Sequence, residues 1–265
     1  MSVLARFRAL PDNDKAMLIR KLVENSTPDF DYFFLIGLST IMATLGLLLD
    51  SGSIVIGSML IAPLMYPILG VSLGLVMMGN KTAVFQRSLS TLVKSLGIGL
   101  GLSVIAAFLF GDGAMYQTAE VLSRTMPSHL HLLVSVAAGA AVAYVLARPE
   151  WSDTLPGVAI AVALIPPLAT IGVGIAALNA AIIKGATMIL LLNLIGIITV
   201  AVVVFLLMNL GEKDNIAEST MKKEDEKLEN EKKVIAEVEQ QISKEGGEIE
   251  KTTIIKENIV YDENK

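Results

Sequence analysis

The chain contains no cysteine, one tryptophan and two histidines among its 265 residues. The lack of cysteine excludes disulfide bridges and thiolate metal sites. Charged residues make up only 18% of the chain, whereas soluble domains usually carry about 25%. Basic clusters interleaved with aromatic residues are also missing, so no nucleic-acid partner is expected. The residues in excess are apolar, and they account for 53% of the sequence.

Recognisable catalytic motifs are missing as well. The sequence has neither a His-Glu-x-x-His pair nor a strand-linked glycine loop that would cradle phosphate. His129 and His131 are two positions apart, so on a helix they diverge and cannot chelate one ion well. We therefore expect a protein that is not an enzyme and that carries no metal and no bound cofactor.

The apolar residues are concentrated in long runs with few or no charges. About 20 such residues cross the hydrocarbon layer of a bilayer as one helix. The runs are residues 32–49, 51–80, 81–110, 132–147, 154–183 and 185–211. The sequence therefore predicts an all-α integral membrane protein with six transmembrane helices.

Two of these runs share residues at a common offset of 103 positions. The matching residues are Asp50 with Asp153, Pro63 with Pro166, and Lys81 with Lys184. Each half then holds three spans, and an odd number of spans makes the second copy enter the membrane from the opposite side. We therefore predict a 3+3 inverted-topology repeat with halves at 31–110 and 134–211, joined by an external connection at 111–133.

Prolines interrupt the second and fifth predicted spans. A proline removes a backbone donor and leaves the carbonyl four residues earlier without its helical partner. Lipid cannot satisfy such a carbonyl, so the break has to face protein or a watery cavity. Paired breaks in inverted halves indicate a central transport site. The sequence thus predicts Pro-broken second and fifth helices, and the alternative is two kinked packing helices.

The candidate substrate-binding residues are the prolines and the nearby side chains that form hydrogen bonds. They are Ser58, Pro63, Tyr66, Pro67, Pro166, Pro167, Thr170 and Asn193. For Asn193, a hydrogen bond between helices is the alternative to lining a cavity.

Two carboxylates are candidate ion sites. Asp50 and Asp153 each stand just before a predicted helix. An N-cap interaction explains an aspartate there, since the carboxylate accepts from free amides and complements the helix dipole. The alternative is a pair of cation or proton sites at opposite mouths of the bundle.

Two basic residues within the third run are candidate charge sites. Arg87 and Lys94 are seven residues apart and share one helical face. If the spanning part begins at residue 81, Lys94 lies near the membrane midplane, where a charge is costly and usually functional. If it begins near Ser95, both side chains reach the membrane surface.

The ends of the chain are charged, and they set the predicted orientation. Basic residues are concentrated in the arm 1–30, around 81–87, at Arg148 and in the tail 212–265, with only Arg124 and Lys184 on the other side. The positive-inside rule therefore predicts that both termini are cytoplasmic.

The sequence leaves two interpretations of the tail 212–265 open. Met221, Leu228, Ile235 and Ile242 fall at a seven-residue spacing, which is a weak heptad. The tail is either solvated and partly disordered, or it forms a helix for homo-oligomerisation or partner binding.

The two proline segments also carry a family resemblance. The run from Ile56 to Ile68, with Ala62-Pro63-Leu64-Met65-Tyr66-Pro67, and the run from Gly157 to Leu168 resemble the signatures of an uncharacterised family of prokaryotic hydrophobic membrane proteins, domain of unknown function 389. The resemblance covers roughly residues 30–210 and implies a prokaryotic cell membrane, with no assigned chemistry. Many members carry a soluble domain ahead of the bundle, in place of the short arm seen here.

The residues and the resemblance together lead to one functional expectation. We expect a channel or secondary transporter for a small ion or solute, embedded in the lipid bilayer of the cytoplasmic membrane. The alternative is a membrane scaffold or sensor whose C-terminal tail couples to a partner.

Overall fold

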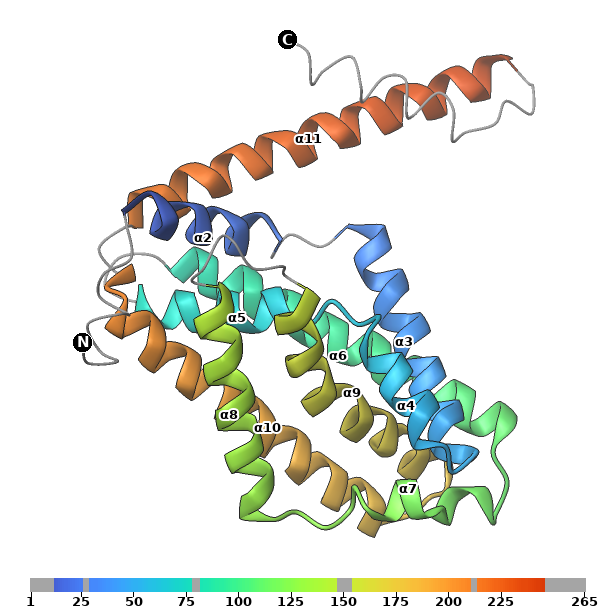
Figure 1. Cartoon of the computed structure of the whole chain (residues 1–265). Coiled ribbons are helices and arrows are strands. Elements are labelled where there is room, and N and C mark those ends of the chain that lie inside the picture. The colour runs from blue at the N-terminus through green and yellow to red at the C-terminus, as the bar shows by residue number, and fades with distance from the viewer. Residues whose placement is uncertain (1–11, 26–28, 78–81, 147–153, 211–213, 246–265) are drawn as a thin grey trace. The chain divides into compact units, whose positions relative to one another are not determined.

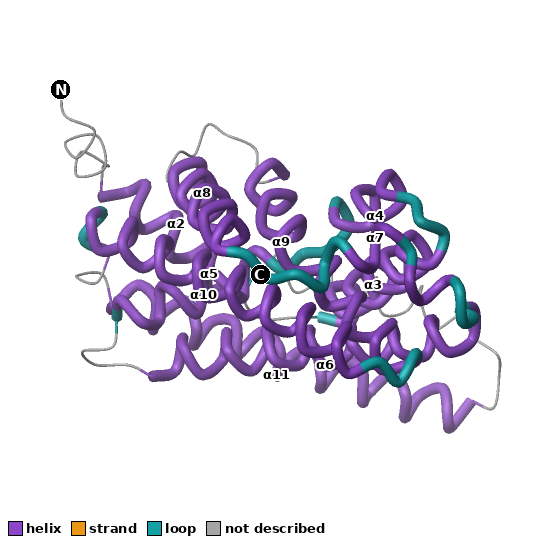
Figure 2. Tube along the Cα trace, turned by 90° about the horizontal axis from the view of Figure 1, so that it is seen from below, coloured by secondary structure: helices purple, strands orange, loops and turns teal. Residues whose placement is uncertain are grey.

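The computed structural model of the chain consists of helices joined by turns and loops in the residues it describes, which are 12–25, 29–77, 82–146, 154–210 and 214–245 (Figures 1 and 2). The helices, in chain order, are α2 (Asp12–Glu24), α3 (Phe30–Leu48), α4 (Gly52–Met59), α5 (Met65–Val76), α6 (Thr82–Phe110), η1 (Met115–Gln117), α7 (Ala119–Leu122), α8 (His129–Leu146), α9 (Thr154–Ala176), α10 (Ala180–Leu207) and α11 (Asp214–Glu245). No strand occurs in these ranges, which confirms the all-helical part of the prediction.

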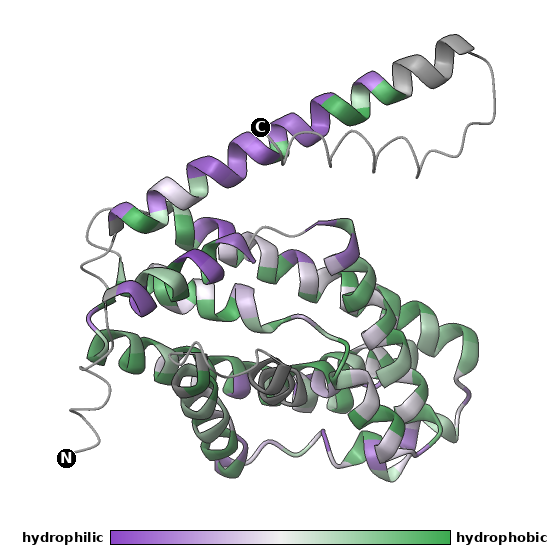
Figure 3. Ribbon diagram, turned by 45° about the horizontal axis from the view of Figure 1, so that its top comes forward, coloured by the Kyte–Doolittle hydropathy of each residue, from purple (hydrophilic) through white to green (hydrophobic). Residues whose placement is uncertain are grey.

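Three helices of the described chain are long and apolar enough to cross a membrane: α3, most of α6, and α10. Shorter apolar segments lie in α5, α8 and α9. Figure 3 shows hydrophobic residues over these helices and hydrophilic residues along α11. The chain is therefore a helical protein of membrane type, and the number of spans stays a prediction.

The chain divides into two compact units, residues 1–217 and 218–265. In the first unit, α2 contacts α5 and buries its apolar face of Leu18, Ile19, Leu22 and Val23, as the spacing of these residues indicates. In the second unit, α11 carries ion pairs between residues four apart. One of them joins Lys233 to Glu229 at 2.9 Å, and its hydrogen bond and charge lower the pKa of Glu229.

The order of contacts shows which helices run in the same direction. Tyr32 near the start of α3 meets Ser95 of α6, and Thr44 further along α3 meets Ser103 further along α6. These two helices are therefore parallel. Ser103 also donates to the carbonyl of Ala169, and Gly99 lies against Leu168, so α9 follows the same direction.

The remaining bundle helices run the other way. Short turns connect α3 to α4 and α9 to α10, and each turn has one residue in the left-handed conformation, Asp50 or Leu178. Gly74 of α5 lies against the backbone of Phe85 in α6, so these two helices also form a hairpin. In α8, Ser135 contacts Asn193 of α10 and Gly139 lies against Ile197, which makes α8 parallel to α10.

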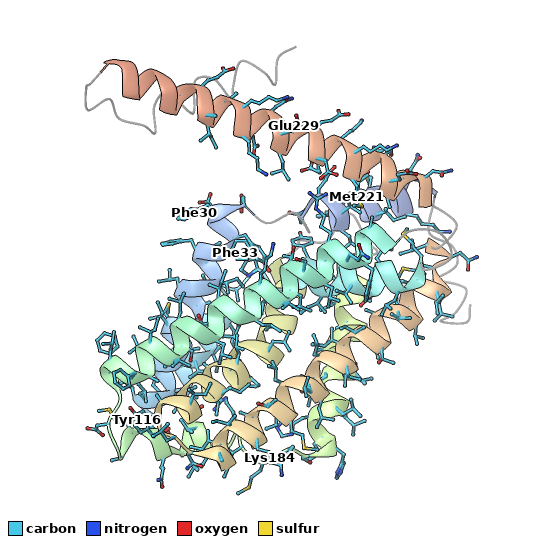
Figure 4. All side chains as sticks on the ribbon, turned by 180° about the vertical axis from the view of Figure 1, so that it is seen from behind. Phe30, Phe33, Tyr116, Lys184, Met221 and Glu229 are labelled. Atoms are coloured by element: carbon cyan, nitrogen blue, oxygen red, sulfur yellow. The ribbon has the colours of Figure 1, made fainter. Side chains whose placement is uncertain are left out.

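The connection between α6 and α8 is fixed to one end of the bundle. Tyr116 donates to the carbonyl of Ala107 at 3.2 Å, and Thr118 donates to the carbonyl of Leu47 at 2.7 Å. Further along, the carbonyl of Thr125 approaches Gly185 of α10 closely. In Figure 4, Tyr116 and Lys184 lie at this end, and Phe30 and Phe33 lie at the opposite end.

We predict that Gly172→Ala destabilises the bundle. A Cβ atom at Gly172 would overlap the Ser103 side chain and lie 3.0 Å from the Ser103 carbonyl carbon, so α6 and α9 would have to separate. Overpacking of this kind costs about 1–3 kcal/mol. Thermal unfolding followed by circular dichroism in detergent measures the loss. Gly101→Ala is the control, because a Cβ atom there meets nothing within 4 Å; an equal loss in both variants would contradict the prediction.

Candidate functional site

The helix break between α4 and α5 is the first part of the candidate site. Residues 60–64 are not helical, and Ala62 and Leu64 within them are buried. Pro63 stands where the helical donor for the carbonyl of Met59 would be, and it has no amide hydrogen. Pro67 lies in the first turn of α5, where a proline is tolerated. The predicted break of the second span is therefore present.

A serine of α3 forms a hydrogen bond with the last turn of α4. The hydroxyl of Ser39 donates to the carbonyl of Ser58 at 2.6 Å, and both side chains are fully buried. The hydroxyl of Ser58 donates in turn to the carbonyl of Val55 at 2.6 Å. The carbonyl of Ser58 also accepts from the amide of Ile61 at 3.3 Å, a bond of the tight turn that ends α4.

The second proline segment differs from the prediction, because α9 is continuous through Pro166 and Pro167. The predicted break of the fifth span is therefore wrong. Adjacent prolines remove the donors for the carbonyls at 162 and 163, yet an α-helix accommodates this when neighbouring helices hold it. Here α3, α6, α8 and α10 all contact α9, and every side chain from Leu164 to Thr170 is buried. Thr170 donates back to the carbonyl of Pro166 at 2.8 Å.

A chain of hydroxyl groups links α3, α6 and α9 beside this segment. Thr44 and Ser103 lie 2.7 Å apart through their hydroxyl oxygens, and Ser103 donates to the carbonyl of Ala169 at 3.0 Å. All three residues are buried. Gly172 allows this approach, because its missing side chain leaves room for Ser103.

α3 therefore connects the two proline segments. Its Ser39 reaches the end of α4, and its Thr44 reaches the hydroxyl of Ser103 and through it the backbone of α9. α4 also contacts α9 directly. We call Ser39, Thr44, Ser58, Ser103 and Thr170 the hydroxyl core.

The chemistry of the hydroxyl core is neutral. Among side chains whose burial the structure describes, the buried polar ones are serine, threonine and one asparagine, and none is charged. In the same ranges no three histidine, aspartate or glutamate side chains gather around a point where a metal ion would bind. Hydroxyl and carbonyl oxygens suit hydrogen bonding to a neutral solute or coordination of a small cation.

Asn193 and Tyr66 are the two remaining candidate residues with polar side chains. The side-chain oxygen of Asn193 accepts from Ser135 of α8 at 2.7 Å, so Asn193 forms the hydrogen bond between helices that was the alternative to cavity lining. Tyr66 lies in the first turn of α5 and is half-buried.

Asp50 is not the N-cap of α4. It follows the last turn of α3 in the left-handed conformation, with φ of 53°, and Ser51 takes the N-cap position. Aspartate tolerates this conformation better than most residues do. Its carboxylate accepts from the amide of Glu120 at 2.8 Å, which attaches α7 to the α3–α4 turn. Asp153, its counterpart at the predicted offset, lies outside the described residues.

The pairing of α3 with α6 shows where the two basic candidates, Arg87 and Lys94, lie along the bundle. Tyr32, in the first turn of α3, shares a hydrogen bond of 2.9 Å with Ser95. Lys94 therefore lies level with the beginning of α3, and Arg87 lies about 10 Å beyond it at 1.5 Å per residue. Lys94 is exposed and Arg87 is half-buried. The surface position of both side chains in the membrane stays a prediction.

Sequence reasoning missed Ser39, Thr44, Ser103 and Ser135 as functional candidates. Their signal was weak, because serine and threonine in an apolar helix commonly bond to a carbonyl three or four residues earlier. A spacing of four or eight does place Ser95, Gly99 and Ser103 on one face of α6. That pattern indicates a polar face but does not identify its partner helix.

We predict an energetic coupling between Thr44 and Ser103. Thr44→Val and Ser103→Ala each remove one member of the pair, and the double-mutant cycle should give a coupling of about 0.6 kcal/mol, up to about 1.7 kcal/mol. Unfolding in detergent measures each variant. Ser90→Ala is the control on the exposed side of α6, and it should show no coupling to Thr44. A coupling free energy of zero between Thr44 and Ser103 would contradict the hydrogen-bonded arrangement of the hydroxyl core.

Comparisons with known proteins agree with the resemblance. Residues 59–199 match the family described as domain of unknown function 389, and the prolines of both segments lie in that range. An uncharacterized protein of Methanocaldococcus jannaschii is 31% identical over 193 residues, which cover 71% of this chain. The chain spans 59% of the length of that relative. No solved structure matches the chain. The chain belongs to the family of domain of unknown function 389.

Proposed function

We propose that this protein is a channel or secondary transporter for a small ion or solute in the cytoplasmic membrane. The observation that carries the proposal is the helix break between α4 and α5, where Ala62 and Leu64 are buried and the preceding turn accepts a hydrogen bond from Ser39 of α3. Non-helical backbone at membrane depth is tolerated where it is enclosed by protein or lines a cavity. Transporters use such broken helices to present carbonyls and amides to their substrates.

The neutral core narrows the substrate class of the proposed transporter. Without a buried carboxylate or ammonium group among the described side chains, the substrate is recognised by hydroxyl and carbonyl dipoles. The end of α4 presents the negative pole of its helix dipole, which favours a cation or a hydrogen-bond donor. A neutral solute rich in donors and a monovalent cation both satisfy this chemistry.

We further propose six spans arranged as a 3+3 inverted repeat. The first half is α3, α4 with α5, and α6; the second is α8, α9 and α10. The segments after Asp50 and Asp153 run in opposite directions, as an inverted repeat requires. In each half the first and third helices are parallel and are joined by a polar pair, Tyr32 with Ser95 or Ser135 with Asn193. These correspondences support the proposal.

The topology is tested by cysteine labelling on this cysteine-free chain. If both termini are cytoplasmic, Asp112→Cys and Lys184→Cys react with an impermeant maleimide added to intact cells. Val260→Cys should react only after permeabilisation, because the positive-inside rule places the tail inside. Labelling of residue 260 in intact cells would contradict the proposed orientation with both termini in the cytoplasm.

The transport site is tested by straightening the helix break. Pro63→Ala restores an amide donor for the carbonyl of Met59, so α4 and α5 can join and withdraw backbone groups from the substrate. We expect flux in proteoliposomes to fall about tenfold, the equivalent of losing one hydrogen bond of about 1.4 kcal/mol. Pro166→Ala is the matched control, and its effect should be smaller because α9 is already continuous.

The flux measurement uses sodium, potassium and chloride currents on supported membranes, and vesicle swelling in glycerol and urea. Each variant is compared at equal expression and with an unchanged elution profile. Unchanged flux in Pro63→Ala would show that this proline has a role in packing and none in transport. Absence of flux for every probe in the unaltered protein would favour the alternative class.

That alternative is a scaffold or sensor that works through the tail. It has one structural observation in its favour, since α11 is a helix of 32 residues with its own ion pairs. Removing residues 212–265 separates the two classes. Flux that persists without the tail supports transport, and loss of a cellular phenotype with intact flux supports coupling to a partner.

A further inference from the structure

The outward face of α6 is not buried by the other helices of the bundle. One face of this helix is buried through Ser88, Leu92, Ser95, Gly99 and Ser103. The opposite face recurs at intervals of three and four residues, which places its members in one line. It consists of Ser90, Lys94, Gly97, Gly101, Ile105 and Phe108, and all six residues are exposed.

Two glycines form the centre of this face. A Cβ atom built on Gly97 or Gly101 meets no atom within 4 Å, whereas one on Gly99 would lie 2.9 Å from both Thr40 and Leu168. Packing of the bundle therefore explains Gly99 and leaves Gly97 and Gly101 unexplained. A glycine within a helix costs about 1 kcal/mol relative to alanine. Exposed apolar side chains at Val93, Ile98 and Ile105 flank the two glycines. We call this surface the glycine groove.

A polar group stands at one end of the glycine groove. Lys94 precedes Gly97 by one turn, Ser90 precedes Lys94 by another turn, and Arg87 lies beside them, half-buried. The hydrogen bond from Tyr32 to Ser95 fixes this level at the first turn of α3. At 1.5 Å per residue, Gly97 and Gly101 lie about 5 and 11 Å deeper, within the roughly 15 Å of one leaflet.

We propose that this face of α6 is a binding site for an anionic phospholipid. The ammonium of Lys94 and the hydroxyl of Ser90 bind the headgroup phosphate. One acyl chain lies in the glycine groove, where the missing side chains bring it close to the backbone. The site is independent of whether the protein transports a substrate.

Charge decides between a lipid and a second copy of the chain as the occupant. Glycines four residues apart also support close crossing of two helices. A symmetric crossing of two α6 helices at Gly97 and Gly101 would bring both Lys94 ammonium groups together at the membrane surface, where they repel. An anionic headgroup at the same place is attracted, because basic residues near an anionic surface gain about 1 kcal/mol each.

The test compares two lipids of equal chain length that differ in headgroup charge. The purified full-length chain in detergent receives dioleoyl-phosphatidylglycerol or dioleoyl-phosphatidylcholine, and native mass spectrometry counts retained lipids. We expect the unaltered protein to retain phosphatidylglycerol preferentially. Lys94→Gln should lower this preference about fivefold, the equivalent of one surface charge. Lys184→Gln, an exposed lysine on α10, is the control and should leave the preference unchanged.

The role of the glycine groove in binding the acyl chain is tested by substitutions that fill it with side chains. Gly97→Leu and Gly101→Leu place side chains where the acyl chain lies, so retention of both lipids at this site should fall. Gly113→Leu is the control, because it also adds a side chain in open space but stands in a loop. Circular dichroism checks that all variants remain helical.

Several results would overturn the proposal. Equal retention of the two lipids by the unaltered protein would do so, as would a phosphatidylglycerol preference that survives Lys94→Gln. Glycerol phosphate that competes as well as the whole lipid would show a phosphate site without an acyl groove. Rapid disulfide formation between two chains carrying Gly101→Cys would show a second copy as the occupant.

Discussion

The need to pair every backbone polar group inside the protein governs this structure, because apolar surroundings offer no water to replace a missing partner. Hydroxyl groups within the bundle have the same need, and they meet it by donating to backbone carbonyls of neighbouring elements. Ser39 donates to the carbonyl of Ser58, Ser103 to the carbonyl of Ala169, and Thr118 to the carbonyl of Leu47. Each of these donors comes from a helix or connection other than the one it serves, so the same bonds also hold the helices in register.

The two proline segments meet this need in different ways. In the first, the helix ends at Met59, resumes at Met65, and leaves the end of α4 covered by α3. In the second, α9 continues through both prolines and relies on the helices packed around it. The result is asymmetric even though α3 is parallel to α6 and α8 is parallel to α10. A site built on freed backbone groups therefore depends chiefly on the first half, which is why Pro63 and Pro166 are expected to differ.

α6 contributes to both the core and the surface. Its hydroxyl face binds α3 and α9, and its glycine face is open to the surroundings. At about 43 Å, its 29 residues exceed the thickness of the hydrocarbon layer. The pairing of Tyr32 with Ser95 places Lys94 level with the first turn of α3 and Arg87 beyond it.

The sequence by itself determined the helical class, the apolar runs and the helix break at Pro63, because these depend on local composition and on the missing amide of proline. It also determined the family, through the residues around the two proline segments. Only the tertiary structure decided that α9 is continuous, since packing by neighbouring helices holds a double proline that lipid alone would not tolerate. Tertiary contacts likewise decided that Asp50 binds the amide of Glu120, that Asn193 pairs with Ser135, and that Gly99 faces inward while Gly97 and Gly101 face outward. These outcomes depend on which helices become neighbours, and a run of apolar residues of similar hydropathy carries little information about its partners.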